Sequence, residues 1–231
     1  MFAIIKDSIF FFRTNFRPIA ILCCIIEGPY ILASNISAFS DPAPAVSYWL
    51  AVILLGATLV IYPYLTGTQI YLFYALFNGQ SPTIGQCLSK GWSCLLRLVL
   101  ASFISLLLTL IGLTLFIIPG IIVAARLSLS SFFIVIEGYD AVDALKHSFA
   151  VTREYTLLIV NSFMLLILVL ILPQIVVYMG LAQLGLYTFI SSTLLDLVSV
   201  ILSSLFFVLL FRIYCLYKRK EEALLTNQMT S

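Results

Sequence analysis

The chain has 231 residues, of which 62% are hydrophobic and 10% are charged, and its mean hydropathy is +1.15. Soluble domains are about 45–50% apolar and about 25% charged, so a soluble domain of this length is excluded because it could not bury so much apolar surface. The net charge is only +2, which excludes the strongly basic surface of a nucleic-acid-binding protein.

The bilayer is therefore the expected environment of this chain. An apolar helix of roughly 20 residues spans a hydrocarbon core of about 30 Å, and backbone groups in lipid need partners within their own segment, which makes the segments helices. We predict an all-α integral membrane protein with a single polytopic domain over residues 1–231. Charges are dispersed through residues 1–18, so no cleaved signal peptide is expected.

Six apolar runs are long enough to be transmembrane helices. Their approximate spans are 18–37, 48–77, 95–118, 120–137, 156–181 and 188–217. Each odd-numbered span follows a short amphipathic segment that is expected to lie at the cytoplasmic surface of the membrane. These interfacial helices are predicted at 2–17, 82–93 and 141–155. The plan is three helical hairpins, each preceded by an interfacial helix.

The expected N-caps of the second and third interfacial helices are Ser81, which is followed by Pro82, and Asp140. The threefold pattern indicates an internal repeat, although the basic flanks that membrane helices share would give a similar pattern. Both interpretations lead to the same six spans.

Lysine and arginine gather on one side of these spans. Eleven of the twelve basic residues flank the same ends: Lys6, Arg13, Arg17, Lys90, Arg97, Lys146, Arg153, Arg212, Lys218, Arg219 and Lys220. By the positive-inside rule this distribution places both the N and C termini in the cytoplasm. The twelfth basic residue, Arg126, lies inside the apolar run FIIPGIIVAARLSL.

Charged side chains at bilayer depth cost about 2.5–3.5 kcal/mol on insertion scales, so each is expected to have a partner or a function. At about 1.5 Å per residue of helix, Glu27 lies roughly 15 Å and Arg126 roughly 16 Å above the cytoplasmic face. We predict an intramembrane ion pair between them, either a clamp between the first and fourth helices or a relay for protons or ions. The clamp is favoured because arginine keeps its charge. Asp196 is expected near the outer boundary, within reach of water.

The second span contains a stretch rich in hydroxyl groups, IYPYLTGTQIYLFY (61–74), with Pro63 inside it. A kinked helix with such a face is able to line a substrate cavity. The candidate lining residues are Tyr62, Tyr64, Thr66, Thr68, Gln69 and Tyr71. Helix packing is the favoured alternative, because tyrosines anchor helices at the interface and small residues such as Gly67 let two helices approach closely.

No catalytic, metal or cofactor site is expected. The five cysteines show no CxxC spacing, and the sequence motifs of zinc proteases, serine hydrolases and phosphate-binding loops are absent. His147 is the only histidine, and it is interpreted as part of a solvated, charged face of the third interfacial helix. The chain is therefore not expected to be an enzyme.

Four segments carry a resemblance to a known family. They are FFRTNFRP (11–18), IIPGII (117–122), DALKHSFAVT (143–152) and LFRIYCLYK (210–218). In this order they resemble the YciC-type family of uncharacterised bacterial inner-membrane proteins and, more loosely, the membrane domain attached to some glycerophosphodiester phosphodiesterases. The resemblance implies a six-helix, multi-pass protein of the bacterial inner (cytoplasmic) membrane without an established activity. Phosphodiesterase chemistry is not implied, because it belongs to a separate soluble domain.

Two functions are compatible with these patterns. The first is a non-enzymatic inner-membrane protein of envelope maintenance, or an accessory protein, which binds membrane lipids or another membrane protein through its cytoplasmic amphipathic segments. The alternative is a small transporter or lipid-translocating protein that uses an intramembrane polar site. A continuous polar cavity along the 62–74 face would favour transport, whereas a tightly packed bundle would favour binding.

Overall fold

The computed structural model describes residues 2–39, 44–166, 168 and 172–230. Every regular element in these ranges is a helix, so the all-α prediction is confirmed. Five stretches of the described residues are long and apolar enough to cross a membrane. They are Phe16–Phe39, Tyr48–Phe77, Ile84–Leu115, Ile117–Glu137 and Phe189–Ala223.

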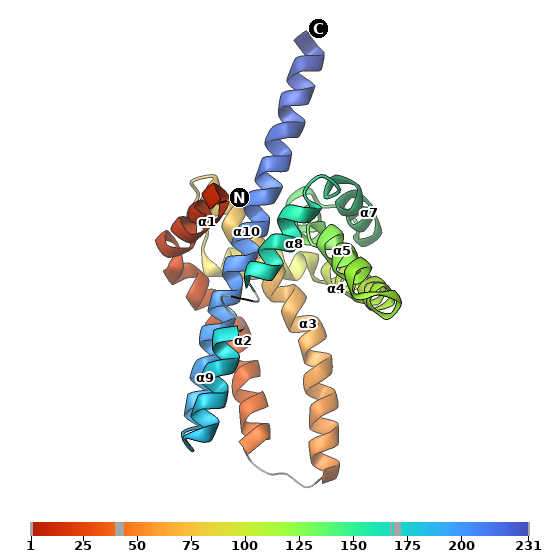
Figure 1. The fold of residues 1–231 in the computed structure, drawn as a ribbon. Coiled ribbons are helices and arrows are strands. Elements are labelled where there is room, and N and C mark those ends of the chain that lie inside the picture. The colour runs from red at the N-terminus through yellow and green to blue at the C-terminus, as the bar shows by residue number, and fades with distance from the viewer. Residues whose placement is uncertain (1, 40–43, 167, 169–171, 231) are drawn as a thin grey trace.

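The helices follow one another along the chain as drawn in Figure 1. They are α1 (Phe2–Thr14), α2 (Phe16–Phe39), α3 (Pro44–Phe77), α4 (Ile84–Leu115), α5 (Ile117–Leu127), α6 (Ser130–Phe132), the π-helix η1 (Phe133–Glu137), α7 (Ala141–Val151), α8 (Thr156–Leu166), α9 (Leu172–Gln183) and α10 (Phe189–Thr230). In Figure 1, α2, α3, α9 and the first part of α10 extend toward one end, and α1, α7 and α8 gather toward the other.

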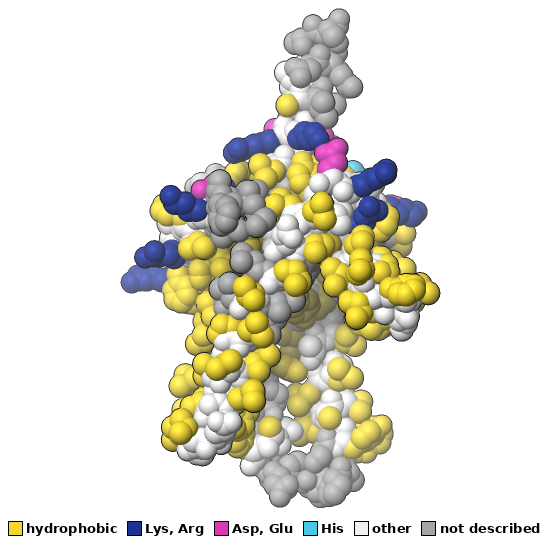
Figure 2. Space-filling view, in the orientation of Figure 1, with side chains coloured by type: hydrophobic (Ala, Val, Ile, Leu, Met, Phe, Trp, Pro, Cys, Tyr) yellow, Lys and Arg dark blue, Asp and Glu magenta, His cyan; other side chains and the backbone are white. Residues whose placement is uncertain are grey.

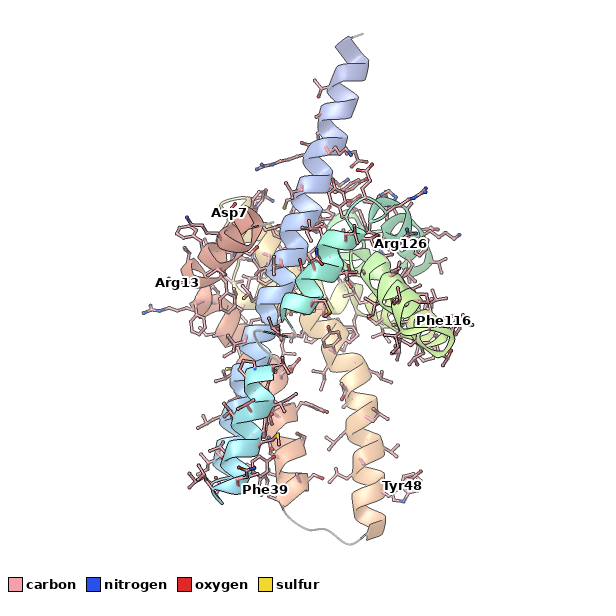
Figure 3. All side chains as sticks on the ribbon, viewed as in Figure 1. Asp7, Arg13, Phe39, Tyr48, Phe116 and Arg126 are labelled. Carbon is pink, nitrogen blue, oxygen red and sulfur yellow. The ribbon has the colours of Figure 1, made fainter. Side chains whose placement is uncertain are left out.

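The last part of α10 projects beyond the other helices at the end where α1 and α7 lie (Figure 1). Lysine and arginine side chains lie at the base of this projection and around the level of α1 and α7, and most of the surface below them is apolar (Figure 2). We call this level, at which Arg13 of α1 lies in Figure 3, the basic belt. A band of cations beside an apolar surface is typical of the boundary between lipid headgroups and the hydrocarbon core.

The second interfacial helix and the third span are one continuous helix, which corrects the prediction of two elements at 82–93 and 95–118. The helix begins at Ile84 because Thr83, and not Ser81, is its N-cap. The Thr83 side chain accepts a hydrogen bond from the Gln86 backbone, and the Gln86 side chain accepts one from the Thr83 backbone. Gly91 does not end the helix; it packs against α3 instead.

The fourth predicted span, 120–137, is not a straight helix. The helix α5 ends at Leu127, a turn follows at Ser128 and Leu129, and the chain then continues through α6 and η1. With 11 residues, α5 is about 16 Å long, which is about half of a hydrocarbon core of about 30 Å. The turn that joins α4 and α5 at Phe116 accordingly lies far from the level of Phe39 and Tyr48 (Figure 3).

The fifth predicted span, 156–181, coincides with two helices, α8 and α9, and part of it (residues 167 and 169–171) lies outside the described residues. The sixth predicted span, 188–217, begins within one residue of α10 but ends early, because α10 continues to Thr230. The third interfacial helix, α7, begins at Ala141 after Asp140, as expected, yet the Asp140 side chain makes no capping hydrogen bond. It instead pairs with Arg97 of α4 at 3.5 Å.

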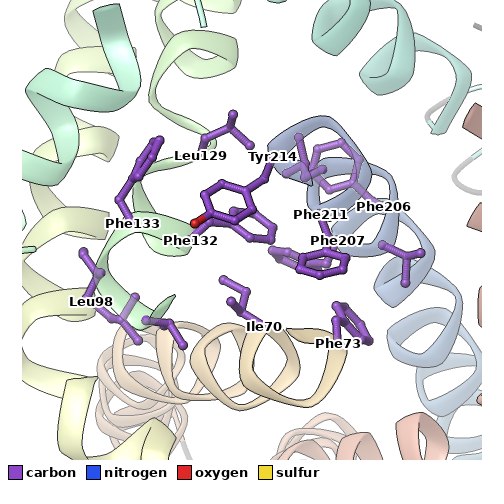
Figure 4. Close-up of a cluster of buried hydrophobic side chains, with 14 of the residues drawn as sticks. Ile70, Phe73, Leu98, Leu129, Phe132, Phe133, Phe206, Phe207, Phe211 and Tyr214 are labelled. Atoms are coloured by element: carbon purple, nitrogen blue, oxygen red, sulfur yellow. The ribbon is translucent and has the colours of Figure 1, made fainter. Parts of the chain in front are cut away.

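The core is aromatic and lies where α3, α6, η1 and α10 meet (Figure 4). Phe132 stacks on Phe211 at 6.3 Å and on Tyr214 at 5.7 Å between ring centroids. Phe73 and Phe133 are fully buried in the same cluster. Because rings of this size bury large areas and pack in defined orientations, the cluster fixes α10 against the short helices that follow α5.

Candidate functional site

A cavity of about 280 Å³ lies between α3, α4, α5, α6 and α10. Its lining is rich in hydroxyl groups and contains no charged side chain among the described residues. The hydroxyl-bearing lining residues are Tyr62, Thr66, Ser102, Ser105, Thr109, Ser128, Ser130 and Ser131. We call this space the hydroxyl cavity.

The hydroxyl groups of the cavity fall into two sets. Thr66, Ser128 and Ser130 donate to backbone carbonyls close to them in sequence, at 2.7–2.9 Å. Over the ranges that the structure describes, the second set makes no hydrogen bond within the protein. Its members are Tyr62, Ser102, Ser105, Thr109 and Ser131. The second set is therefore available to a bound molecule.

The hydroxyl cavity opens sideways between the helices. Tyr62 and Leu106 in its lining are 52% and 45% exposed, whereas Phe206 and Phe207 on the α10 side are buried. The Tyr62 and Phe207 rings lie 6.2 Å apart between centroids. The cavity is thus open beside Tyr62 and Leu106 and closed on the α10 side.

The α4 wall of the cavity was not anticipated. Ser102, Ser105 and Thr109 follow one another at spacings of three and four residues, which places them on one face of a helix. They stand out in a segment otherwise made mostly of leucine, isoleucine and other apolar residues. This spacing is the sequence signal that would have found the wall.

Of the six predicted lining residues, Tyr62 and Thr66 do line the cavity. They are four residues apart and share one face of α3. Tyr64 and Thr68 point to α4 instead. The Tyr64 hydroxyl donates to the Leu88 carbonyl at 3.2 Å, and Thr68 is fully buried beside Gly91.

The other two predicted lining residues belong to the interior of the bundle. The Gln69 amide is buried and donates to Ser204 Oγ of α10 at 2.8 Å and to Cys23 Sγ of α2 at 3.2 Å. Tyr71 is partly buried and packs against the hydrophobic core. Gln69 therefore ties three helices together and is not part of a cavity wall.

Glu27 and Arg126 form no ion pair in the described part of the chain. The Arg126 guanidinium lies over the Phe149 ring of α7, 4.7 Å from its centroid. The Arg126 backbone carbonyl accepts hydrogen bonds from Ser148 at 2.7 Å and Thr152 at 2.9 Å. Arg126 is thus held by α7 and by Thr152 at its end, and not by Glu27 of α2.

The depth estimate for Arg126 assumed one straight helix down to Glu137, and the turn at Ser128 and Leu129 breaks that helix. In Figure 3, Arg126 lies near the level of Asp7 and Arg13 and well away from Phe39. Arg126 therefore lies at the level of the basic belt. Among the described residues no group of three or more histidine, cysteine, aspartate or glutamate side chains could hold a metal ion.

Asp196 lies in a hydrogen-bonded cluster between three helices. Its carboxylate accepts a hydrogen bond from the Asn35 amide of α2 at 2.9 Å and another from the Tyr178 hydroxyl of α9. Nearby, Ser199 of α10 donates to the Gln174 side chain of α9 at 2.9 Å. The sequence placed Asp196 near water, whereas the structure gives it protein donors from two neighbouring helices.

The all-helical architecture and its apolar stretches define a multi-pass helical membrane protein. The chain belongs to the uncharacterised protein family UPF0259, whose family model matches residues 43–216. The prediction that the chain belongs to a family of uncharacterised membrane proteins is confirmed, and the family is UPF0259.

Two curated relatives illustrate the relationship. The chain is 32% identical over 155 residues to a UPF0259 membrane protein of Yersinia pestis (strain Pestoides F), and to the same extent to one of Yersinia pseudotuberculosis (serotype O:3). Each match covers 67% of this chain and 59% of the relative, so the match spans less than two thirds of the relatives' length. No solved structure matches the chain.

Proposed function

We propose that this protein is a non-enzymatic, lipid-binding component of the bacterial inner membrane, in which the hydroxyl cavity holds the uncharged, oxygen-bearing part of a lipid. The observation that carries the proposal is the set of five hydroxyl groups that line the cavity without a hydrogen-bond partner in the described residues. A ligand with oxygen acceptors supplies the missing partners.

The chemistry of the lining selects the ligand class. A polar group kept from water without a hydrogen bond costs about 1–3 kcal/mol, so several such hydroxyls side by side favour a bound polar molecule. Because no charged side chain lines the cavity among the described residues, an ionised group would be desolvated there without compensation. Ester carbonyls and alcohol groups of lipids fit this environment, and the open side beside Tyr62 and Leu106 leaves room for their hydrocarbon chains.

The basic belt supports the orientation that goes with this proposal. We place both termini and the projecting end of α10 in the cytoplasm, with α8 and α9 together as one further crossing, since cations gather at the belt (Figure 2) and cytoplasmic flanks are enriched in lysine and arginine. The α1 helix carries exposed Ile9 and Phe10, and α7 carries exposed Val142 and Phe149. These apolar side chains contact lipid or another membrane protein at the belt, which suits a role in envelope maintenance.

The depth of the cavity favours lipid translocation as a second candidate function. Thr66 lies eleven residues before the end of α3 at Phe77, so the α3 wall of the cavity is about 16 Å along the helix from that end, near the middle of a core of about 30 Å. The wall at Ser128 adjoins Arg126 at the basic belt, so the cavity extends from the belt toward the middle of the membrane. Purified protein in liposomes with a fluorescent lipid distinguishes the two functions. A translocating protein speeds the exchange of the probe between leaflets, and a lipid-holding protein leaves it unchanged.

Filling the cavity is expected to expel the lipid. The Ser105→Phe variant places a ring in a cavity of about 280 Å³ and removes one unpaired hydroxyl, so the affinity for the lipid should fall by about tenfold, or about 1.4 kcal/mol, and the fraction of protein that retains a lipid should fall with it. Native mass spectrometry of protein washed extensively in detergent measures this fraction. The matched control is Ser203→Phe, because Ser203 of α10 is exposed and bonds only the nearby Val200 carbonyl. Equal lipid retention in the two variants would count against the proposal.

A further inference from the structure

Two further cavities, which share part of their lining, lie at the basic belt where the end of α3 meets α10. The smaller, of about 90 Å³, is lined by Asp7, Phe77, Arg212, Cys215, Leu216 and Arg219. The larger, of about 510 Å³, shares Phe77, Cys215 and Arg219 with it and extends to Glu137, Lys218 and Glu222. No residue that the structure describes lines both this pair and the hydroxyl cavity, so the two sites are separate.

Two arginines of this pair of cavities are free to bind an anion. Arg212 and Arg219 are seven residues apart on α10, which puts them on the same face, and neither forms an ion pair within the described residues. The Arg212 guanidinium lies 5.8 Å from the ring centroids of both Phe11 and Phe77. The aromatic contacts hold the cation in place and leave its N–H groups available.

Lys218, by contrast, already forms ion pairs with two carboxylates of the protein. Its ammonium lies 3.1 Å from Glu137 and 2.8 Å from Glu221, and Glu137 also accepts a hydrogen bond from Tyr214 at 2.7 Å. This network closes one side of the larger cavity. Among the described lining residues, the charges without an ion pair near Arg219 are Arg212 and the carboxylates of Asp7 and Glu222.

The balance of charge indicates the class of ligand. Among the described residues, three cations and three carboxylates line the paired cavities, so their formal charges cancel. A site built only for an anionic lipid would carry a net positive charge, as basic pockets between membrane helices do at the cytoplasmic side. A balanced site with free arginines and free carboxylates fits a headgroup that carries both a phosphate and a cation.

We propose that the paired cavities bind the headgroup of a zwitterionic phospholipid with a primary ammonium group, such as phosphatidylethanolamine. The lipid phosphate lies between Arg212 and Arg219, because guanidinium groups donate paired hydrogen bonds to phosphate oxygens. The ammonium lies against Asp7 of α1, which lines the same small cavity. The acyl chains extend from the basic belt toward the apolar surface of the bundle.

The test is a competition between lipids measured by native mass spectrometry on purified protein in detergent. Wild-type protein is expected to bind phosphatidylethanolamine in preference to phosphatidylglycerol and phosphatidylcholine offered at equal concentration. Arg219→Gln is expected to lower phosphatidylethanolamine binding by about tenfold, and Asp7→Asn is expected to shift the preference toward phosphatidylglycerol, because it removes the negative charge that faces the ammonium.

The matched control is Lys220→Gln, which removes the neighbouring cation of α10 that is paired with Glu154, and its lipid preference should equal that of wild type. Thermal unfolding of each variant establishes that it is folded. A lipid preference unchanged by both Arg219→Gln and Asp7→Asn overturns the proposal. Complete displacement of the lipid by millimolar inorganic phosphate also overturns it, because the ligand would then be a free anion. Ser105→Phe should leave this preference intact, so failure here and failure of the hydroxyl cavity are distinguishable.

Discussion

Replacing Gly91 by valine is expected to unfold or severely destabilise the protein. A Cβ atom at position 91 would lie 2.4 Å from Thr68 Cγ2 and 3.2 Å from the Tyr64 ring, and Thr68 is fully buried, so the neighbour has no room to move. Forcing extra atoms into a packed interface costs about 1–3 kcal/mol, and more where the backbone must shift. The variant acts on the crossing of α3 and α4, which positions two walls of the hydroxyl cavity.

The measurement is thermal unfolding in detergent, with Gly85→Val as the matched control. Gly85 lies in the same helix, and a Cβ atom there would meet nothing within 4 Å. A cost of about 3 kcal/mol corresponds to a fall of roughly 6–12 °C in the unfolding midpoint for a chain of this size. Equal midpoints for the two variants would show that α3 and α4 do not cross at this glycine.

Replacing Asp196 by alanine is the second change with a large expected effect. The substitution removes the acceptor of both the Asn35 amide and the Tyr178 hydroxyl, and hydrogen bonds to a charged group contribute about 1.5–3 kcal/mol each. We expect a loss of about 3 kcal/mol in the free energy of unfolding. We also expect faster hydrogen exchange in α9, because the cluster joins α9 to α2 and α10.

Asp196→Asn should cost less, since the amide oxygen still accepts one hydrogen bond. Ser203→Ala is the control on the same helix, because its hydroxyl bonds only the nearby Val200 carbonyl. Hydrogen exchange measured by mass spectrometry resolves α9 from the rest of the chain. If Asp196→Ala and Ser203→Ala give the same exchange in α9, the cluster does not hold that helix.

The helical architecture was accessible from the sequence because apolar runs of about 20 residues have the length of a membrane-spanning helix, which satisfies its backbone groups within its own segment. The bounds of α2 and α3 lie close to the spans 18–37 and 48–77 for the same reason. Helix breaks were harder to predict. The hydropathy of an apolar run is the same whether its helix is straight or broken. Hydropathy therefore predicts neither the turn at Ser128 and Leu129 nor the continuity of α4 through Gly91.

Arg126 shows how such a break affects the prediction of a site. The depth match with Glu27 depended on a rise of about 1.5 Å for every residue down to Glu137, and the turn after Leu127 removes that assumption. The cation lies instead over Phe149 at the basic belt. A side chain's depth follows from its helix's path, which depends on tertiary contacts that a single sequence does not reveal.

The hydroxyl-rich face of α3 indicates a cavity or helix packing, and packing is the favoured interpretation from the sequence. In the structure, Tyr62 and Thr66 line the cavity, whereas Thr68 and Gln69 contact other helices. The opposite wall, with Ser102 and Ser105 of α4, requires knowledge of which helices are neighbours. Residue type identifies polar positions in an apolar helix, and only the packing decides whether they meet a cavity or a partner.

A structure determined by electron cryo-microscopy in native lipid tests the central claim most directly, since it shows what the hydroxyl cavity contains. We predict an elongated density that enters beside Tyr62 and Leu106 and ends with an oxygen-bearing group within hydrogen-bond distance of Ser102, Ser105 or Ser131. A cavity filled by the protein's own side chains, or by water alone, would contradict the lipid-binding proposal.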